Sequence, residues 1–130
     1  LYSSAASDVY KRQLTNHLSL PEMAALLAYA PLLISNNTGP VHMAAALGTP
    51  VVDLYALTNP QHTPWGVPHR VLFHDVTCKY CYKSVCPEGH HQCLRLVPPA
   101  AIVQAARELM QDRGRDTYSS TGPISSVSRV

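Results

Sequence analysis

The residues with the clearest chemical potential form a turn, Asn37-Thr38-Gly39-Pro40, between a short apolar run and a helix-like segment. The first turn of a helix carries unpaired N–H groups and a partial positive charge, which attract phosphate. Gly39 allows a phosphate to approach the backbone closely, and His42 follows Thr38 by four residues, so both can face the helix start. The spacing predicts a diphosphate site. A simple N-cap at position 37 or 38, followed by a surface histidine, would produce the same pattern.

A second group of reactive residues lies in one segment, which we call the cysteine segment (residues 78–93). It contains all four cysteines of the chain: Cys78, Cys81, Cys86 and Cys93. Two cysteines with two residues between them form a chelating turn, and four thiolates complete a tetrahedral site. We therefore predict a structural metal, zinc or iron, for which His90 or His91 could replace one sulfur. Reduced packing thiols and a redox pair are the alternatives, and a disulfide is disfavoured in a cytosolic enzyme.

A long loop at residues 58–66 is expected at the same, carboxyl, edge of the sheet as the turn. Ligands of open α/β sheets bind at that edge. His62 and Trp65 could therefore stack on a base or a sugar. For Trp65 we favour the simpler interpretation, in which the indole packs against the neighbouring edge of the sheet.

The elements that must position these residues alternate between helix and strand, which is typical of an α/β fold with a parallel sheet. Ser19 and Glu22 have the spacing of a capping box, Pro21 lies at the helix start, and Pro31 ends that helix. Gly48 is expected to end the helix that follows the turn. The expected elements are helix 23–30, strand 32–35, helix 41–47, strand 51–55, strand 70–73 and helix 99–111.

The chain is expected to contain one domain, residues 14–111, with the cysteine segment as an insert. Residues 1–13 show no helical or strand period, and we interpret them as a non-native leader, with a surface loop as the alternative. Residues 112–130 are rich in Ser, Thr and Gly, lack an apolar period and are predicted to be a flexible tail.

Composition excludes several classes of function. The net charge of the 130 residues is +2, and the ten basic residues are scattered, so no nucleic-acid partner is indicated. No apolar run approaches the roughly 20 residues that span a bilayer, and the start lacks the apolar core of a signal peptide. We therefore expect a cytoplasmic protein. Because the first residue is Leu and not Met, we also expect a fragment.

The run from Leu33 to Val52 resembles the signature of glycosyltransferase family 9, which includes the heptosyltransferases of the lipopolysaccharide inner core. It contains the Thr38-Gly39 pair, His42 after two spacers, a helix of small residues and a Gly-Thr-Pro turn. The resemblance extends over about residues 14–110. It implies the GT-B architecture of two facing Rossmann-like halves, of which this chain is the C-terminal half, truncated on its N-terminal side.

This resemblance implies an enzyme that transfers heptose from ADP-heptose to the inner core of lipopolysaccharide, at the cytoplasmic face of the inner membrane and with only peripheral membrane contact. The donor would bind Asn37, Thr38, Gly39 and His42, and transfer would require no cofactor. The acidic residue of the family pattern is Asn37 here, which cannot act as a carboxylate. No catalytic residue is expected in this chain, since the family places its Asp base in the N-terminal half. The chain alone is therefore expected to be inactive.

Two alternatives remain. A nucleotide-sugar epimerase shares the GT-B architecture, but its phosphate turn reads Ser-Gly-Gly with a Glu soon after, and this chain has Thr-Gly-Pro-Val-His. A small metal-binding interaction module centred on residues 78–93 would fold from Thr77 onward with metal alone.

Overall fold

A three-stranded sheet, in the order β1-β2-β3, organises the computed structural model, which describes residues 12–56 and 58–119. Both strand pairs are parallel, which confirms the predicted α/β class. The elements are α1 (Leu20–Tyr29), β1 (Leu33–Asn36), α2 (Gly39–Ala46), β2 (Val51–Leu54), the 3-10 helix η2 (Pro60–His62), β3 (His69–Leu72), α3 (Gln92–Arg95) and α4 (Pro99–Ser119).

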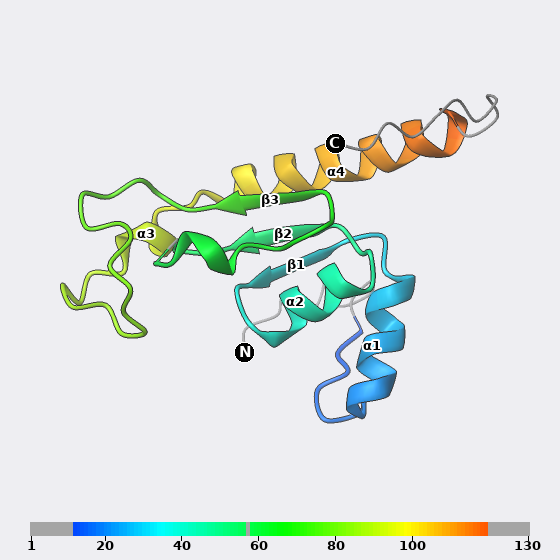
Figure 1. Cartoon of the computed structure of the whole chain (residues 1–130), viewed down its shortest axis with the longest axis horizontal. Helices are drawn as coiled ribbons and strands as arrows, with labels where there is room; N and C mark the ends of the chain where they lie inside the picture. Colours follow the sequence, from blue (N-terminus) through cyan, green and yellow to red (C-terminus); the bar gives the residue numbers. More distant parts are fainter. Residues whose placement is uncertain (1–11, 57, 120–130) are drawn as a thin grey trace, which may run out of the picture.

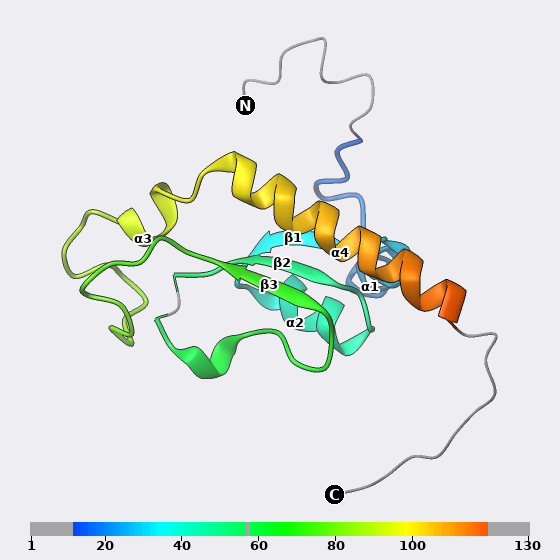
Figure 2. The same ribbon diagram turned by 90° about the horizontal axis from the view of Figure 1, so that it is seen from above.

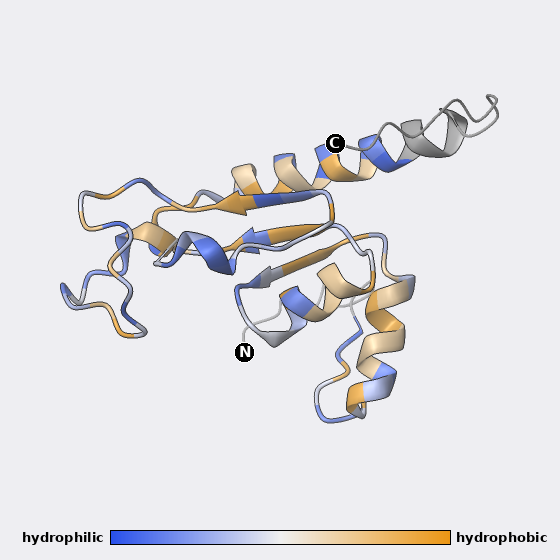
Figure 3. Cartoon of the chain, viewed as in Figure 1, coloured by the Kyte–Doolittle hydropathy of each residue, from blue (hydrophilic) through white to orange (hydrophobic). Residues whose placement is uncertain are grey.

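Helices cover both faces of the sheet, with α1 and α2 on one side and α4 on the other (Figure 1, Figure 2). Successive residues of a strand point to opposite faces. Val51 therefore packs with Leu27 and Val41 beneath α1 and α2, whereas Val52 packs with Leu109 of α4. This double covering explains why β1 and β2 are largely apolar (Figure 3).

The register of the sheet places the carboxyl ends of the three strands side by side. Asn36 at the end of β1 is opposite Leu54, and Leu54 is opposite Leu72 at the end of β3. The predicted phosphate turn (residues 37–40), the 58–66 loop and the cysteine segment each follow one of these strand ends. All three chemistry-bearing segments of the sequence therefore leave from the same edge of the sheet.

Local sequence signals predicted most element boundaries to within a few residues of those in the structure. The carboxylate of Glu22 accepts from the Ser19 N–H at 2.8 Å and from the Ser19 hydroxyl at 2.6 Å, so α1 begins as the capping-box spacing predicts. Gly48 follows α2 with φ +81°, the left-handed conformation expected after a helix end.

The last helix is longer than predicted. α4 continues past Gln111, its predicted end, to Ser119, so the start of the predicted tail at residue 112 is wrong. Contacts with distant segments support the extra turns: Asp112 lies 3.9 Å from Arg70, and Arg113 donates to the carbonyl oxygens of Ala30 and Pro31. A helix that is already formed lengthens at little cost, without an apolar stripe.

Two other predictions concern residues outside the described ranges. Most of the predicted leader, residues 1–11, and the remainder of the predicted tail, residues 120–130, are not described. Within residues 12–56 and 58–119, no helix combines the length and apolar character that crossing a membrane requires.

Candidate functional site

The predicted phosphate turn joins the carboxyl end of β1 to the start of α2. Thr38 is the N-cap of α2, with extended backbone angles, and Pro40 lies in the first turn. The Thr38 hydroxyl donates to the Asn36 carbonyl at 3.2 Å, and Val41 N–H donates to the Thr38 carbonyl at 3.0 Å. Since Pro40 has no N–H, the backbone donors available to a ligand here are those of Thr38 and Gly39.

Three of the four residues predicted to bind the sugar donor lie at an accessible surface. Thr38, Gly39 and His42 are exposed, whereas Asn37 is half-buried. A Cβ atom added to Gly39 would meet no protein atom within 4 Å, so the space beside this residue is open. A larger side chain at position 39 would therefore obstruct a ligand without a clash inside the protein.

Asn37 faces the interior of the site. Its amide nitrogen donates to Asp53 Oδ2 at 2.7 Å and to the His62 carbonyl at 2.7 Å. Both partners can only accept hydrogen bonds, so the amide nitrogen, and not the amide oxygen, must face them. Asn37 therefore ties the turn to β2 and to η2, and its amide oxygen is the only part left for a ligand.

Asp53 is a residue of the site that the sequence reasoning missed. The side chain is fully buried in β2, and its Oδ1 is the one buried side-chain oxygen or nitrogen without a partner among the described residues. Burial raises the pKa of the Asp53 carboxyl, while the Asn37 hydrogen bond and the nearby His42 and His69 oppose the rise. The available signal was a single carboxylate within the otherwise apolar strand 51–54.

A groove lies between α2 and the 58–66 loop, with a volume of about 340 Å³. His42 and Ala45 of α2 line one wall, and His62 and Trp65 line the other. The expectation that Trp65 packs against the sheet edge is wrong, because the residue is 76% exposed. Pro64, which is fully buried, anchors the loop in its place.

Tyr55 and Asn59 order the loop that forms this wall. The Tyr55 hydroxyl accepts from Asn59 N–H at 2.9 Å and lies 3.0 Å from the Asn59 carbonyl and 3.2 Å from Thr58 Oγ1. The Asn59 side chain in turn accepts from Gln61 N–H at 3.0 Å, as the N-cap of η2, and lies 3.2 Å from His62 Nε2. The His62 face of the groove is therefore held by hydrogen bonds that begin at the end of β2.

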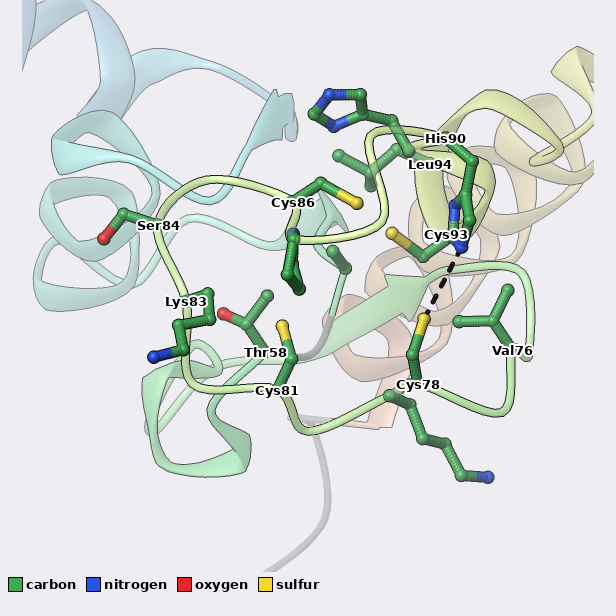
Figure 4. A pocket seen from close by; sticks show the side chains of 14 residues that line it. Thr58, Val76, Cys78, Cys81, Lys83, Ser84, Cys86, His90, Cys93 and Leu94 are labelled. Atoms are coloured by element: carbon green, nitrogen blue, oxygen red, sulfur yellow. Dashed lines mark hydrogen bonds between the residues drawn. The ribbon is translucent and has the colours of Figure 1, made fainter.

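The cysteine segment surrounds a separate cavity of about 140 Å³. All four cysteines are free, half-buried and part of its lining, and their sulfurs are directed into it (Figure 4). His90 Nε2 lies 3.7 Å from Cys78 Sγ. Backbone N–H groups, first that of His91, lower the pKa of the Cys86 thiol, whereas burial raises the pKa of the Cys93 thiol.

The predicted metal site is not preformed. Within residues 12–56 and 58–119, no three His, Cys, Asp or Glu side chains are close enough together to hold an ion. The four cysteines share one cavity without sharing one coordination centre, and metal binding there stays a prediction.

The chain is similar to heptosyltransferases. Residues 4–92 match the model of glycosyltransferase family 9 (heptosyltransferase). Lipooligosaccharide heptosyltransferase 2 of Campylobacter jejuni is 27% identical over 107 residues, which are 81% of this chain and 34% of that protein. Lipooligosaccharide heptosyltransferase 2 of Haemophilus influenzae is 37% identical over 99 residues, 75% of this chain and 29% of that protein.

A solved structure agrees with these relatives. The crystal structure of a glycosyltransferase of family 9 from Veillonella parvula matches with a TM-score of 0.62 and 29% identity, covering 73% of this chain and 28% of that chain. The chain spans about a third of the length of the curated relatives it matches.

Proposed function

Because the chain belongs to glycosyltransferase family 9, the heptosyltransferase family, we propose that it is the donor-binding part of an enzyme that transfers heptose from ADP-heptose to the inner core of lipopolysaccharide. The whole enzyme has the GT-B architecture and works at the cytoplasmic face of the inner membrane, with peripheral contact to it. Transfer itself uses no cofactor.

The turn between β1 and α2 is the observation that carries this proposal. Thr38 and Gly39 are exposed at the start of α2, with open space beside Gly39. A helix start with accessible N–H groups attracts a diphosphate through its donors and its partial positive charge. The adjacent groove, lined by His42, His62 and Trp65, receives the base or the sugar of the donor.

These residues act on the leaving group of the reaction. As the bond between the sugar and the diphosphate breaks, negative charge develops on the phosphate oxygens, and donors already aimed at them stabilise that charge. The N–H groups at the α2 start and the His42 imidazole supply such donors. The acceptor hydroxyl must lose its proton to a base, which the family resemblance assigns to the N-terminal half.

Asn37 supports this site from behind. Both N–H bonds of its amide are used on Asp53 and on the His62 carbonyl. We assign it the role of holding the turn against the groove wall, while its oxygen accepts a hydrogen bond from a donor hydroxyl.

Calorimetric titration of ADP into the whole enzyme tests the donor assignment. Gly39→Val obstructs the approach of the phosphate, and His42→Ala removes one charged hydrogen bond. Such a bond contributes roughly 1.5–3 kcal/mol, so we expect binding to weaken about tenfold to a hundredfold. His17→Ala is the matched control, because His17 is exposed and lies outside the groove.

Unchanged ADP affinity in folded Gly39→Val and His42→Ala proteins would remove the turn from the donor site. Product analysis with ADP-heptose distinguishes a heptosyltransferase from an epimerase. An epimerase converts the nucleotide sugar without an acceptor, whereas a heptosyltransferase releases ADP only when an inner-core acceptor is present.

A further inference from the structure

Asp53 is a buried carboxylate that lies next to the proposed donor site. Among residues 12–56 and 58–113, it is the one charged side chain that is fully buried. Its Oδ2 accepts from the Asn37 amide at 2.7 Å, and its Oδ1 has no partner among the described residues. A buried charge with so few hydrogen bonds is costly, and an apolar residue would fill this place in a strand at lower cost. The carboxylate therefore points to a role outside the core.

The sheet places this carboxylate behind the turn between β1 and α2. Val51 packs beneath α1 and α2, and Asp53, two positions further along β2, lies on the same face of the sheet. Burial raises the pKa of the Asp53 carboxyl, and the Asn37 hydrogen bond and then the charge of His42 on α2 oppose that rise. Because no part of the residue is exposed, Asp53 can act on a ligand only through another side chain.

Asn37 is the side chain through which Asp53 can act. A side-chain amide has donors at its nitrogen and an acceptor at its oxygen, and the two ends have nearly the same shape. The nitrogen of Asn37 donates to Asp53 Oδ2 and to the His62 carbonyl, both at 2.7 Å. An ionised carboxylate can only accept, and the bond from Asn37 favours the ionised form by lowering the pKa of Asp53. The pair therefore leaves the amide oxygen as the end that is open to a ligand.

We propose that Asp53 is a positioning residue for the donor sugar. With the donor bound along the turn and in the adjacent groove, as the proposed function has it and as this role requires, Asp53 fixes the Asn37 oxygen toward the sugar. The site then selects a sugar that has a hydroxyl group at this point. A sugar without that hydroxyl leaves the half-buried Asn37 oxygen without a partner, and sites built to bind a hydroxyl discriminate strongly against such analogues.

The contacts with the diphosphate do not depend on Asp53. Local hydrogen bonds hold the backbone of the turn: the Thr38 hydroxyl donates to the Asn36 carbonyl at 3.2 Å, and Val41 N–H donates to the Thr38 carbonyl at 3.0 Å. The Asn37 side chain is held instead by bonds to β2 and to η2. Loss of the Asp53 acceptor should therefore weaken recognition of the sugar and leave recognition of the diphosphate nearly unchanged.

Calorimetric titration of the whole enzyme with ADP and with ADP-heptose tests this separation. Asp53→Val fills the same place in β2 with an apolar side chain and leaves one N–H of Asn37 without its acceptor. Because the ligand must then order the freed amide, we expect ADP-heptose to bind about threefold to tenfold more weakly and the ADP affinity to stay within about twofold. Equal weakening of both ligands would show that Asp53 only supports the turn, and an unchanged ADP-heptose affinity would show that it has no part in binding. Either result overturns the proposal.

Further variants separate the orientation of the amide from a general loosening of the strand. Asp53→Asn keeps an acceptor oxygen and should have an ADP-heptose affinity within about twofold of the wild type. Val52→Ala disturbs the same strand on its other face, beneath α4, and should weaken neither ligand selectively. In Asn37→Ala the amide is gone, so adding Asp53→Val should cause no further selective loss. No recovery in Asp53→Asn, a selective loss in Val52→Ala, or additive losses in the double variant overturns the role through Asn37.

A measurement on the wild type keeps the proposal testable if the variants at position 53 fail to fold. Among ADP-heptose analogues in which one sugar hydroxyl is replaced by hydrogen, one should bind about fivefold or more weakly than ADP-heptose. If every analogue binds like ADP-heptose, the proposal is overturned. ADP binding that Gly39→Val leaves unchanged removes the donor site, and with it the role of Asp53. ADP binding that Gly39→Val abolishes, with no selective loss in Asp53→Val, overturns the role of Asp53 alone.

Discussion

Replacing Asn37 with Asp turns the amide that holds the phosphate turn into a carboxylate that has no hydrogen to donate. The amide nitrogen now lies 2.7 Å from Asp53 Oδ2 and 2.7 Å from the His62 carbonyl. In the Asn37→Asp protein both contacts become oxygen against oxygen, beside an Asp53 oxygen that already lacks a partner. A hydrogen bond to a charged group contributes roughly 1.5–3 kcal/mol, and an uncompensated buried charge costs about 3–5 kcal/mol. We therefore expect a loss of about 3–5 kcal/mol in the free energy of unfolding at pH 8.

The loss should depend on pH in a definite direction. Two carboxyl groups in contact share a proton, so the folded state of Asn37→Asp binds a proton more tightly than the unfolded chain does. Burial already raises the pKa of Asp53 in the wild type. A raised pKa in the folded state means that stability falls as the pH rises from about 4, the unfolded value. The destabilisation of Asn37→Asp relative to wild type should therefore be smaller at pH 5 than at pH 8.

Urea unfolding at the two pH values measures this effect in the wild type, Asn37→Asp, Asn36→Asp, Asp53→Asn and the double variant Asn37→Asp/Asp53→Asn. Asn36→Asp is the matched control, since it makes the same chemical change at the neighbouring, exposed position. The double variant Asn37→Asp/Asp53→Asn should recover much of the lost stability, because the amide at position 53 can then donate to the carboxylate at position 37. We call the two hydrogen bonds from the Asn37 amide to Asp53 and to the His62 carbonyl the clamp. The clamp is refuted if Asn37→Asp and Asn36→Asp have the same free energy of unfolding at pH 8. It is also refuted if the loss in the double variant equals the sum of the losses in the two single variants.

Two further predictions concern activity and the groove. This chain, mixed with ADP-heptose and an inner-core acceptor, should give no heptose transfer above background, since the family resemblance assigns the base to the other half of the enzyme; turnover by a pure preparation would contradict this. Trp65→Ala should change the free energy of unfolding by less than about 0.5 kcal/mol, because the side chain is 76% exposed. It should nevertheless weaken ADP-heptose binding by the whole enzyme, and an unchanged affinity in calorimetry would show that the indole does not contact the donor.

The sequence predicted the structure correctly wherever interactions between residues close in the chain determine it. The capping box of Ser19 and Glu22, the left-handed Gly48 and the strand, turn and helix around Gly39 each depend on neighbours within a few positions. The α/β class followed from the alternation of these elements. The parallel register then brought the three chemistry-bearing segments to one edge, because the carboxyl ends of parallel strands lie at the same edge of a sheet.

What the sequence did not predict depends on contacts between distant segments. The length of α4 is supported by contacts of Asp112 with β3 and of Arg113 with the two residues that follow α1. Trp65 is exposed, whereas the neighbouring Pro64 is fully buried. The clamp at Asn37 joins residues 16 and 25 positions away in the chain, and no periodicity or short motif carries that information.

The hydrogen bonds of Asn37 also bear on why this chain has an amide at position 37, where the family pattern has an acidic residue. An acidic residue at position 37 cannot coexist at low cost with a buried carboxylate at position 53, because both groups only accept hydrogen bonds when ionised. An amide at position 37 beside Asp53 keeps one donor and one carboxylate in the pair. The substitution is therefore compatible with an intact phosphate turn, because the Thr38 and Gly39 backbone donors do not depend on the charge at position 37. What the amide cannot supply is a negative charge toward a ligand. If the turn binds the donor as we propose, the effect of this departure should appear in recognition of the sugar and not of the diphosphate.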